Sequence, residues 1–149
     1  MLAAESDPGA APYIIRWPRK RHRQALADPD QSQLIVELGD RPIGFVLLSG
    51  LAGGHRSIEL RRIVIGPRGR GLGRSALELV LEHAFGALRA HRVWLDVKVH
   101  NERARRAYAG AGFVHEGVLR DALLTDGVFE SLAVMSVIEP EWTGRERRQ

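Results

Sequence analysis

Hydrophobic and polar residues alternate along the first half of the chain in short runs that are typical of β-strands. Residues 33–38 and 43–48 form two such runs, and the connection between them, Gly39-Asp40-Arg41-Pro42, predicts a β-hairpin. Residues 57–65 form a third run, which is apolar on both faces near its end. We expect this third strand at the centre of a sheet, because a strand that is apolar on both faces must be covered on both.

A helical period replaces the alternation after a glycine-rich loop. From Ser75, apolar side chains recur every three or four residues, at Leu77, Val80, Leu81, Ala84, Phe85 and Leu88. Residues 91–99 then alternate strictly again, which predicts a strand with one covered face. A strand, loop, helix and strand in this order predict two parallel strands joined by a right-handed crossover.

The remaining third of the chain predicts one more helix and a closing pair of strands. Asn101 is a good N-cap residue, and the helix that it opens ends at Gly110-Ala111-Gly112. Residues 113–120 and 130–138, joined through Asp126-Gly127, are expected to pair antiparallel. Before the first strand we expect a loose leader over residues 1–12 and a short helix over residues 19–27. This order of elements predicts a mixed α/β fold.

Composition limits the class of protein. A chain of 149 residues with 44% hydrophobic and 27% charged residues fits one globular domain, expected over residues 13–142 and followed by a basic tail over 143–149. No apolar stretch approaches the roughly 18 residues that span a bilayer, and residues 1–12 lack the apolar core of a signal peptide, so we expect a cytoplasmic protein. The absence of cysteine excludes disulfides, thiolate metal sites and a cysteine nucleophile.

Arginine carries most of the positive charge. Lysine and arginine number 22 against 18 acidic residues, with clusters at residues 19–23 and 145–148. These clusters are either solvated ends of the chain or contacts for a polyanion. Few aromatic residues and no interleaving of basic with aromatic residues argue against a nucleic-acid-binding protein.

The glycine-rich loop from Arg68 to Arg74 lies between the third strand and the first long helix. Backbone N–H groups and the positive end of a helix dipole meet at such a loop, which suits a phosphate group. The other interpretation is a tight turn that needs glycine only for positive φ angles. No Gly-Lys-Ser/Thr sequence follows, and the G-x-G-x-x-G spacing is missing, so nucleotide hydrolysis and hydride transfer are excluded.

The loop and a downstream segment together resemble the GNAT superfamily of N-acetyltransferases. The loop has the form Arg68-x-x-Gly71-x-Gly73, and Asn101, Ala104, Tyr108, Gly112 and Phe113 follow in the spacing of that superfamily. Residues 58–65 and 94–97 resemble the branch that contains the ribosomal-protein N-terminal acetyltransferases, and the resemblance covers residues 33–142. The loop after Pro67 is shorter than in many members. Only about 30 residues precede the strand at residue 33, so we expect a shortened acceptor side or the loss of the first strand.

This resemblance implies a fold, a cosubstrate and a set of binding residues. The fold is a central mixed, mostly antiparallel sheet with a parallel pair splayed around CoA and helices on both faces. Acetyl-CoA is the implied acyl donor, with no metal. The implied CoA-binding residues are Ile63, Val64, Ile65, Arg68, Gly69, Arg70, Gly71, Leu72, Gly73, Arg74, Asn101, Ala104 and Tyr108. Backbone along residues 63–65 would hold the pantetheine, with an N–H near Val64 or Ile65 polarising the thioester carbonyl.

Two residues are candidates for proton transfer. Tyr108 lies two helical turns, about 10 Å, after Asn101 and is the candidate acid for the departing thiolate, unless its ring only packs on the core. Glu59 is the candidate base, since strict alternation puts it on the same strand face as Arg61, Ile63 and Ile65; the alternative is an ion pair with Arg61 or Arg62. His55, His100 and His115 are reserve bases, and Asp96 and Asp121 are weaker ones.

The sequence thus predicts transfer of an acetyl group to a primary amine, by direct attack in a ternary complex. The amine belongs either to a protein N-terminus or to a small molecule. A CoA-binding regulatory domain without catalysis is the alternative, and a basic nucleic-acid-binding protein is a more remote one. We also expect a homodimer, formed by pairing or exchange of the final strands.

Overall fold

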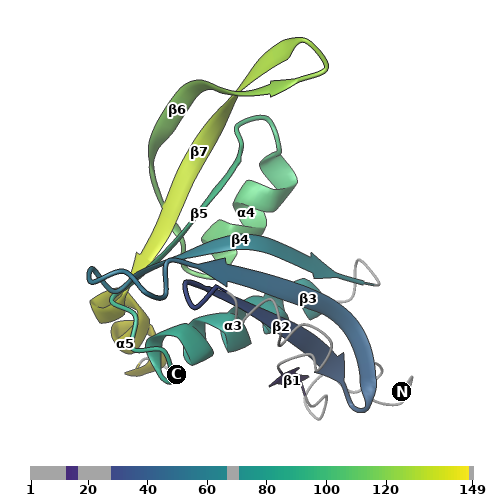
Figure 1. Ribbon diagram of the computed structural model, residues 1–149, viewed down its shortest axis with the longest axis vertical. Helices are drawn as coiled ribbons and strands as arrows, with labels where there is room; N and C mark the ends of the chain where they lie inside the picture. The colour runs from purple at the N-terminus through teal and green to yellow at the C-terminus, as the bar shows by residue number, and fades with distance from the viewer. Residues whose placement is uncertain (1–12, 17–27, 67–70, 148–149) are drawn as a thin grey trace.

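A seven-stranded sheet runs through the computed structural model, which describes residues 13–16, 28–66 and 71–147 (Figure 1). The strands lie in the order β1-β2-β3-β4-β5-β7-β6, and all neighbours are antiparallel except β4 and β5. Their bounds are Tyr13–Arg16 for β1, Gln31–Leu38 for β2, Arg41–Ser49 for β3, Ser57–Ile65 for β4, Arg92–Lys98 for β5, Val114–Thr125 for β6 and Val128–Ile138 for β7. The mixed α/β fold, the central place of β4 and the parallel β4–β5 pair are confirmed.

The first strand of the sheet is present. Residues of β1 pair antiparallel with β2, from Tyr13 opposite Leu38 to Arg16 opposite Ile35. Of the two alternatives, a shortened acceptor side or the loss of the first strand, the second is therefore wrong, and among the described residues β1 precedes β2. The sequence Tyr-Ile-Ile is rich in aromatic and β-branched residues, which favour a strand, but four residues are too few to show a period. The helix expected over residues 19–27 lies outside the described residues.

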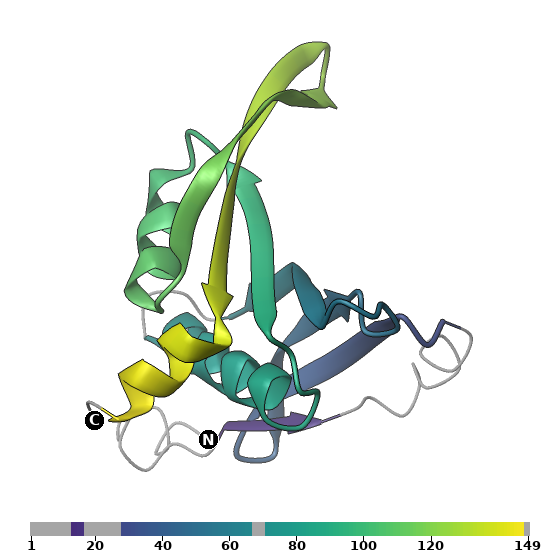
Figure 2. The same cartoon turned by 90° about the vertical axis from the view of Figure 1, so that its left-hand side faces the viewer.

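Three helices are described: α3 over Leu72–Phe85, α4 over Glu102–Gly110 and α5 over Glu139–Arg147. The apolar face of α3 is buried against the sheet, as its three-and-four spacing predicts, although the helix begins at Leu72 rather than at Ser75. All three pack on one face of the sheet, which we call the helix face; the other is the reverse face (Figures 1 and 2). Coverage of the reverse face by helices stays a prediction.

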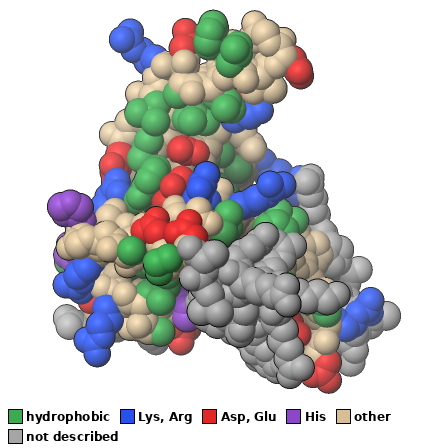
Figure 3. Space-filling view, viewed as in Figure 1, with side chains coloured by type: hydrophobic (Ala, Val, Ile, Leu, Met, Phe, Trp, Pro, Cys, Tyr) green, Lys and Arg blue, Asp and Glu red, His purple; other side chains and the backbone are tan. Residues whose placement is uncertain are grey.

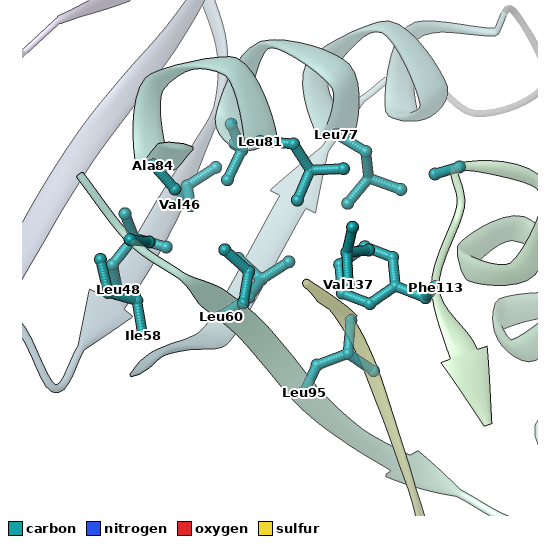
Figure 4. Packing of buried hydrophobic residues seen from close by; sticks show 14 of the residues in the cluster. Val46, Leu48, Ile58, Leu60, Leu77, Leu81, Ala84, Leu95, Phe113 and Val137 are labelled. Carbon is teal, nitrogen blue, oxygen red and sulfur yellow. The ribbon is translucent and has the colours of Figure 1, made fainter. Parts of the chain in front are cut away.

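The core lies between α3 and the helix face. Leu77, Leu81 and Ala84 of α3 point toward β3, β4 and β5, and Phe113 and Val137 close the same cluster (Figure 4). These side chains are at most 4% exposed, apart from partly buried residues at the rim. One continuous apolar cluster therefore joins both halves of the sheet to the helix that follows the glycine loop.

The chain end is helical where a tail was expected. Helix α5 continues to Arg147, so the segment expected as a basic tail is helical as far as residue 147. Glu141 accepts a hydrogen bond from the N–H of Ile138 at 3.0 Å, and Thr143 donates to the carbonyl of Glu139 at 2.7 Å. Trp142 stacks on Phe85 of α3, with ring centroids 5.9 Å apart. Capping and this aromatic contact hold the helix against the core.

Strands β6 and β7 extend beyond the rest of the sheet. Their pairing is antiparallel through Asp126-Gly127, as expected, but both strands are longer than predicted. Two irregularities in β6 allow the extension, and at the second one Asp121 has φ of 46° and donates its N–H to Ser131 Oγ at 3.0 Å. Because β5 ends at Lys98, opposite Leu132, residues 120–131 project as an arm with no third strand beside them (Figures 1 and 2).

Candidate functional site

A cleft opens where the two parallel strands separate. Strands β4 and β5 are paired only over three positions, from Ser57 opposite Arg92 to Glu59 opposite Trp94. Beyond this point β4 stays with β3, and β5 stays with β7. The backbone edge of β4 that faces β5 is then available to a ligand in place of a neighbouring strand. A cavity of about 540 Å³ lies here on the helix face, between β4, α3 and α4.

The start of α3 provides the polar end of the cleft. Gly71 is the N-cap residue, and its φ of 71° lies in the left-handed region that favours glycine. The first turn holds no acidic residue, and Arg74 lies within it. The first N–H groups of a helix have no partner inside the helix, so this end attracts an anion. Arg74 also forms an ion pair with Glu78 at 3.6 Å.

Helix α4 forms the opposite wall. Asn101 caps it, since its side chain accepts a hydrogen bond from the N–H of Ala104 at 3.1 Å, and the Asn101 amide carries two further donors. Tyr108 lies two turns further on, half-buried, with its ring edge against Phe113 at a centroid distance of 5.8 Å. Burial raises the pKa of the Tyr108 hydroxyl above its usual value of 10.0, so the hydroxyl keeps its proton at neutral pH.

Most of the residues that the sequence singled out for CoA meet in this cleft. Nine of them line it: Ile63, Ile65, Gly71, Leu72, Gly73, Arg74, Asn101, Ala104 and Tyr108. Arg68, Gly69 and Arg70 lie outside the described residues, and the Val64 side chain faces away, 43% exposed. Leu77, Arg103 and Ala107 also line the cleft and were missed. Helical spacing from Gly73 and Ala104 could have found Leu77 and Ala107.

The expected position of Glu59 relative to Ile63 is wrong. Leu48 pairs with Leu60, whereas Leu47 pairs with Arg62, so Arg61 is an extra residue in the ladder. This bulge reverses the alternation of β4. Glu59 therefore lies on the reverse face, while Ile63 and Ile65 lie on the helix face with the cleft.

Glu59 does not line the cleft, but it lies where the gap between β4 and β5 begins. It belongs to the last paired position before β4 and β5 separate, so the gap between the strands begins beside it. Its Oε1 accepts a hydrogen bond from Ser49 Oγ at 3.2 Å, and Ser49 is 8% exposed. The alternative, an ion pair with Arg61 or Arg62, is not among the contacts of the described residues; Arg62 instead lies over the Phe45 ring, 5.9 Å from its centroid.

Carboxylate groups continue along the reverse face from Glu59. Pairing places Trp94 beside Glu59, and alternation along β5 puts Asp96 on the same face. Glu116 joins them, bound by the Ser136 hydroxyl and by Arg92 at 2.8 and 3.0 Å. These bonds, the Ser136 bond first, hold the pKa of Glu116 below its usual 4.5. Figure 3 shows acidic side chains gathered near the base of the arm.

The reserve bases lie apart from the cleft. His100 pairs with Glu130 at 3.4 Å, His55 is exposed in the β3–β4 loop, and His115 lies on the outer side of α4. Asp121 lies on the arm. None of these four residues lines the cleft.

Neither a metal centre nor a membrane-spanning helix is found among residues 13–16, 28–66 and 71–147. No group of three or more His, Asp or Glu side chains there is arranged to hold a metal ion. No described helix is both long and apolar enough to cross a membrane.

Comparisons with known proteins agree with this geometry. A family model described as the acetyltransferase (GNAT) family matches residues 3–113. The spermidine N(1)-acetyltransferase of Vibrio cholerae is 28% identical over 127 residues, which cover 83% of this chain and 73% of that protein. The ribosomal protein uS5-alanine N-acetyltransferase of Escherichia coli is 28% identical over 120 residues, covering 79% and 58%.

A solved structure gives the same result for the fold. It is described as a dodecameric structure of the spermidine N-acetyltransferase from Vibrio cholerae in an intermediate state. It superposes with a TM-score of 0.75 at 28% identity and covers 85% of this chain and 75% of its own.

Proposed function

Since the chain belongs to the acetyltransferase (GNAT) family and is an N-acetyltransferase, we propose that it acetylates a small, multiply charged primary amine such as a polyamine. The observation that carries this proposal is the opening of the sheet at Glu59 and Trp94, directly between the cleft and a carboxylate-bearing face. The similarity to a spermidine N(1)-acetyltransferase supports the same acceptor class. The cytoplasmic location remains a prediction.

In this proposal, acetyl-CoA supplies an activated thioester and lies along the cleft. The N–H groups at the start of α3, together with Arg74, bind the pyrophosphate. The β4 backbone at residues 63–65 holds the pantetheine and donates an N–H to the thioester carbonyl. The cleft fits such a ligand because it is apolar along Ile63 and Leu77 and cationic at Arg74 and Arg103.

Glu59 acts on the amine from the reverse face. A primary amine with pKa near 10.4 is protonated in all but roughly one molecule in 2,500 at pH 7, so a base must take its proton. The neutral nitrogen then attacks the thioester carbon and the new C–N bond forms. The C–S bond breaks as the nitrogen gives up its second proton to solvent. Tyr108 donates a hydrogen bond to the departing sulfur, and CoA leaves with a proton from solvent or from Tyr108.

Asp96 holds the distal charge of the acceptor. A carboxylate attracts an ammonium group, and Asp96 follows Trp94, the partner of Glu59, on the reverse face. The Trp94 ring already has the Arg92 guanidinium over it, 5.8 Å from its centroid. An amine without a second ammonium group has no charge for Asp96 to bind. A protein N-terminus is the second candidate acceptor, favoured by the uS5-alanine N-acetyltransferase relative.

An acceptor panel tests this function. Purified protein is mixed with acetyl-CoA and with spermidine, n-hexylamine or an alanine-initiated peptide, and thiol release is followed with a disulfide reagent. The chain has no cysteine, so every thiol detected is CoA. We expect spermidine to be turned over at least tenfold faster than n-hexylamine at equal concentration. Turnover of the peptide alone would replace the polyamine by the N-terminal acceptor.

A variant of Asp96 tests whether this carboxylate binds the second charge of the acceptor. Asp96→Asn should raise KM for spermidine about tenfold and leave KM for n-hexylamine unchanged, because only the first has a second charge to lose. Glu82→Gln, the same charge change on the exposed side of α3, is the control. Equal effects of Asp96→Asn on both amines would contradict the assignment of Asp96.

The chain also associates with itself in this proposed function. The structure of the Vibrio cholerae relative is described as dodecameric, which supports the homodimer expected from the final strands.

A further inference from the structure

Arg103 brings a positive charge into the cleft that no ion pair among the described residues neutralises. It is exposed in the first turn of α4, which borders the gap between β4 and β5, and it lines the same cavity as Arg74 and Tyr108 (Figure 1). A guanidinium group holds its N–H donors in one plane, in a geometry that suits a carboxylate or a phosphate. The α4 wall of the cleft therefore carries a site for an anionic group.

This site is separate from the anion site at the start of α3. There the free N–H groups of the first helical turn and the Arg74 side chain face the same end of the cleft, and the turn contains no acidic residue. Arg74 is also held to its own helix by the ion pair with Glu78 at 3.6 Å. The cleft thus has two cationic sites, one on each wall, and a ligand that fills it can bind with two anionic groups.

The position of Arg103 along α4 places its charge away from the reacting end of the ligand. Tyr108 marks the reacting end in the proposed function, and Arg103 lies five residues before it, about 7.5 Å back along the helix axis. Side chains on a helix lean toward its N-terminus, so the guanidinium group lies further still from Tyr108. Arg103 is therefore suited to the nucleotide end of acetyl-CoA rather than to the acetyl group.

Coenzyme A carries two separate anionic groups at its nucleotide end. The pyrophosphate is attached to the 5′ oxygen of the ribose, and a phosphate monoester is attached to the 3′ oxygen. Because the α3 wall takes the pyrophosphate in the proposed function, the 3′-phosphate is left for a cation on the facing wall. A phosphate monoester has a charge of about −1.5 to −2 at pH 7 and three acceptor oxygens, which a guanidinium group can bind with two donors at once.

We propose that Arg103 binds the 3′-phosphate of CoA and makes the enzyme select acetyl-CoA over acetyl donors that lack this group. The neighbouring arginines of α4 are differently placed. Arg105 donates a hydrogen bond to the carbonyl of Val99 at 2.8 Å, and Arg106 lines a groove on the outer side of the helix. This assignment rests on the proposed binding of acetyl-CoA in the cleft, but it is independent of the acceptor, which enters from the reverse face.

Binding of CoA and of dephospho-CoA to the full-length protein tests the assignment. Affinities are measured by isothermal titration calorimetry at about 50 mM salt, where charge interactions are weakly screened. We expect wild type to bind CoA about tenfold more tightly than dephospho-CoA. Arg103→Gln should bind both ligands with the affinity that wild type has for dephospho-CoA. Arg106→Gln, the same charge change three residues further along α4, should keep the tenfold preference. Thermal melting checks that both variants fold.

Three results would overturn the proposal. Equal affinity of wild type for the two ligands, or binding of neither, would show that nothing holds the 3′-phosphate. An equal loss of affinity for both ligands in Arg103→Gln would assign Arg103 to the pyrophosphate. A preference for CoA that survives in Arg103→Gln would assign the 3′-phosphate to another residue. Binding of CoA with the expected preference, but without turnover of spermidine, would refute the proposed acceptor and support the role of Arg103.

Steady-state rates give a second readout. The 3′-phosphate lies far from the reacting carbon, so its contact with Arg103 is equally strong in the ground state and in the transition state. Arg103→Gln should therefore raise KM for acetyl-CoA about tenfold and leave kcat within about twofold. With acetyl-dephospho-CoA as the donor, the variant should match wild type in both constants. A lower kcat with an unchanged KM would show that Arg103 acts on the chemical step and would contradict the proposal.

Discussion

Replacing Tyr108 by phenylalanine separates two roles that the structure gives to this residue. The ring packs against the core and against Phe113, and phenylalanine keeps those contacts. The hydroxyl is the group proposed to donate a hydrogen bond to the departing sulfur, and phenylalanine removes it. The substitution therefore changes chemistry without opening a cavity, so the thermal midpoint should move by less than about 2 °C.

The magnitude follows from the acidity of the two groups. Full proton transfer from a phenol of pKa near 10 to a thiolate of pKa near 8.5 is uphill by about 2 kcal/mol. Burial raises the pKa of Tyr108 further, so transfer costs more than this. Tyr108 therefore acts chiefly by donating a hydrogen bond to the sulfur as its charge develops. Loss of one donor to developing charge in an enclosed site lowers the rate by about 10²–10³-fold.

The assay is thiol release at saturating acetyl-CoA and acceptor, with kcat and KM measured separately. We expect Tyr108→Phe to lower kcat at least a hundredfold and to leave KM for acetyl-CoA within a factor of about three. The wild-type rate should not fall on the alkaline side until above pH 10, since the raised pKa keeps the hydroxyl protonated. A variant with kcat within threefold of wild type would refute the reasoning and leave Tyr108 as a packing residue.

Three other substitutions test the remaining parts of the site. Glu59→Gln should lower kcat/KM about 10²–10⁴-fold at pH 7. Ser49→Ala removes only the 3.2 Å hydrogen bond to Glu59 and should lower kcat/KM about fivefold; equal losses in the two variants would show that Ser49 has another role. Gly44→Ala would place a Cβ 1.9 Å from the Val64 carbonyl oxygen and force β4 to move. Urea unfolding should therefore show a loss of about 1–3 kcal/mol in stability, and CoA binding should weaken. Gly54→Ala, which has open space around its Cβ, should match wild type in both measurements. The pKa of Glu116 lies below 4.5 in the fold, so its stabilising contribution is present above pH 4.5 and is lost as pH falls through the folded value. Glu116→Gln should lower the free energy of unfolding by under about 1 kcal/mol at pH 7, since the side chain is 40% exposed. The variant should also lose stability less steeply with falling pH than wild type, and an unchanged pH profile would contradict this.

Local patterns were enough for the elements that carry most of the cleft. The spacing of Leu77, Val80 and Leu81 predicted α3, and the cap at Asn101 predicted α4, because both signals act over a few neighbouring residues. The glycine loop and the Asn101–Tyr108 segment predicted the family, which the comparisons confirm. Helix α5 was missed, although Glu139-Pro140-Glu141 resembles a helix start, because arginines dominate the segment that follows.

The face of Glu59 shows where sequence patterns stop. Strict alternation assigned it to the side of Ile63, and the bulge at Arg61 moved it to the other side. A bulge arises from the pairing of two strands, and nothing in the residues 57–65 alone records it. The exposure of Phe129 is similar, because an apolar residue in an alternating strand predicts burial unless the strand outruns its neighbours.

The sequence by itself determined the family, the order of most elements and nine of the residues that line the cleft, since these depend on local spacing. Tertiary structure alone decided that β4 and β5 separate after Glu59, that the Glu59 side chain and the cleft lie on opposite faces of the sheet, and that the arm projects from it. These properties depend on contacts between residues far apart in the chain. A periodicity shows which side chains share a face of one element, whereas only the packed fold determines what lies opposite that face.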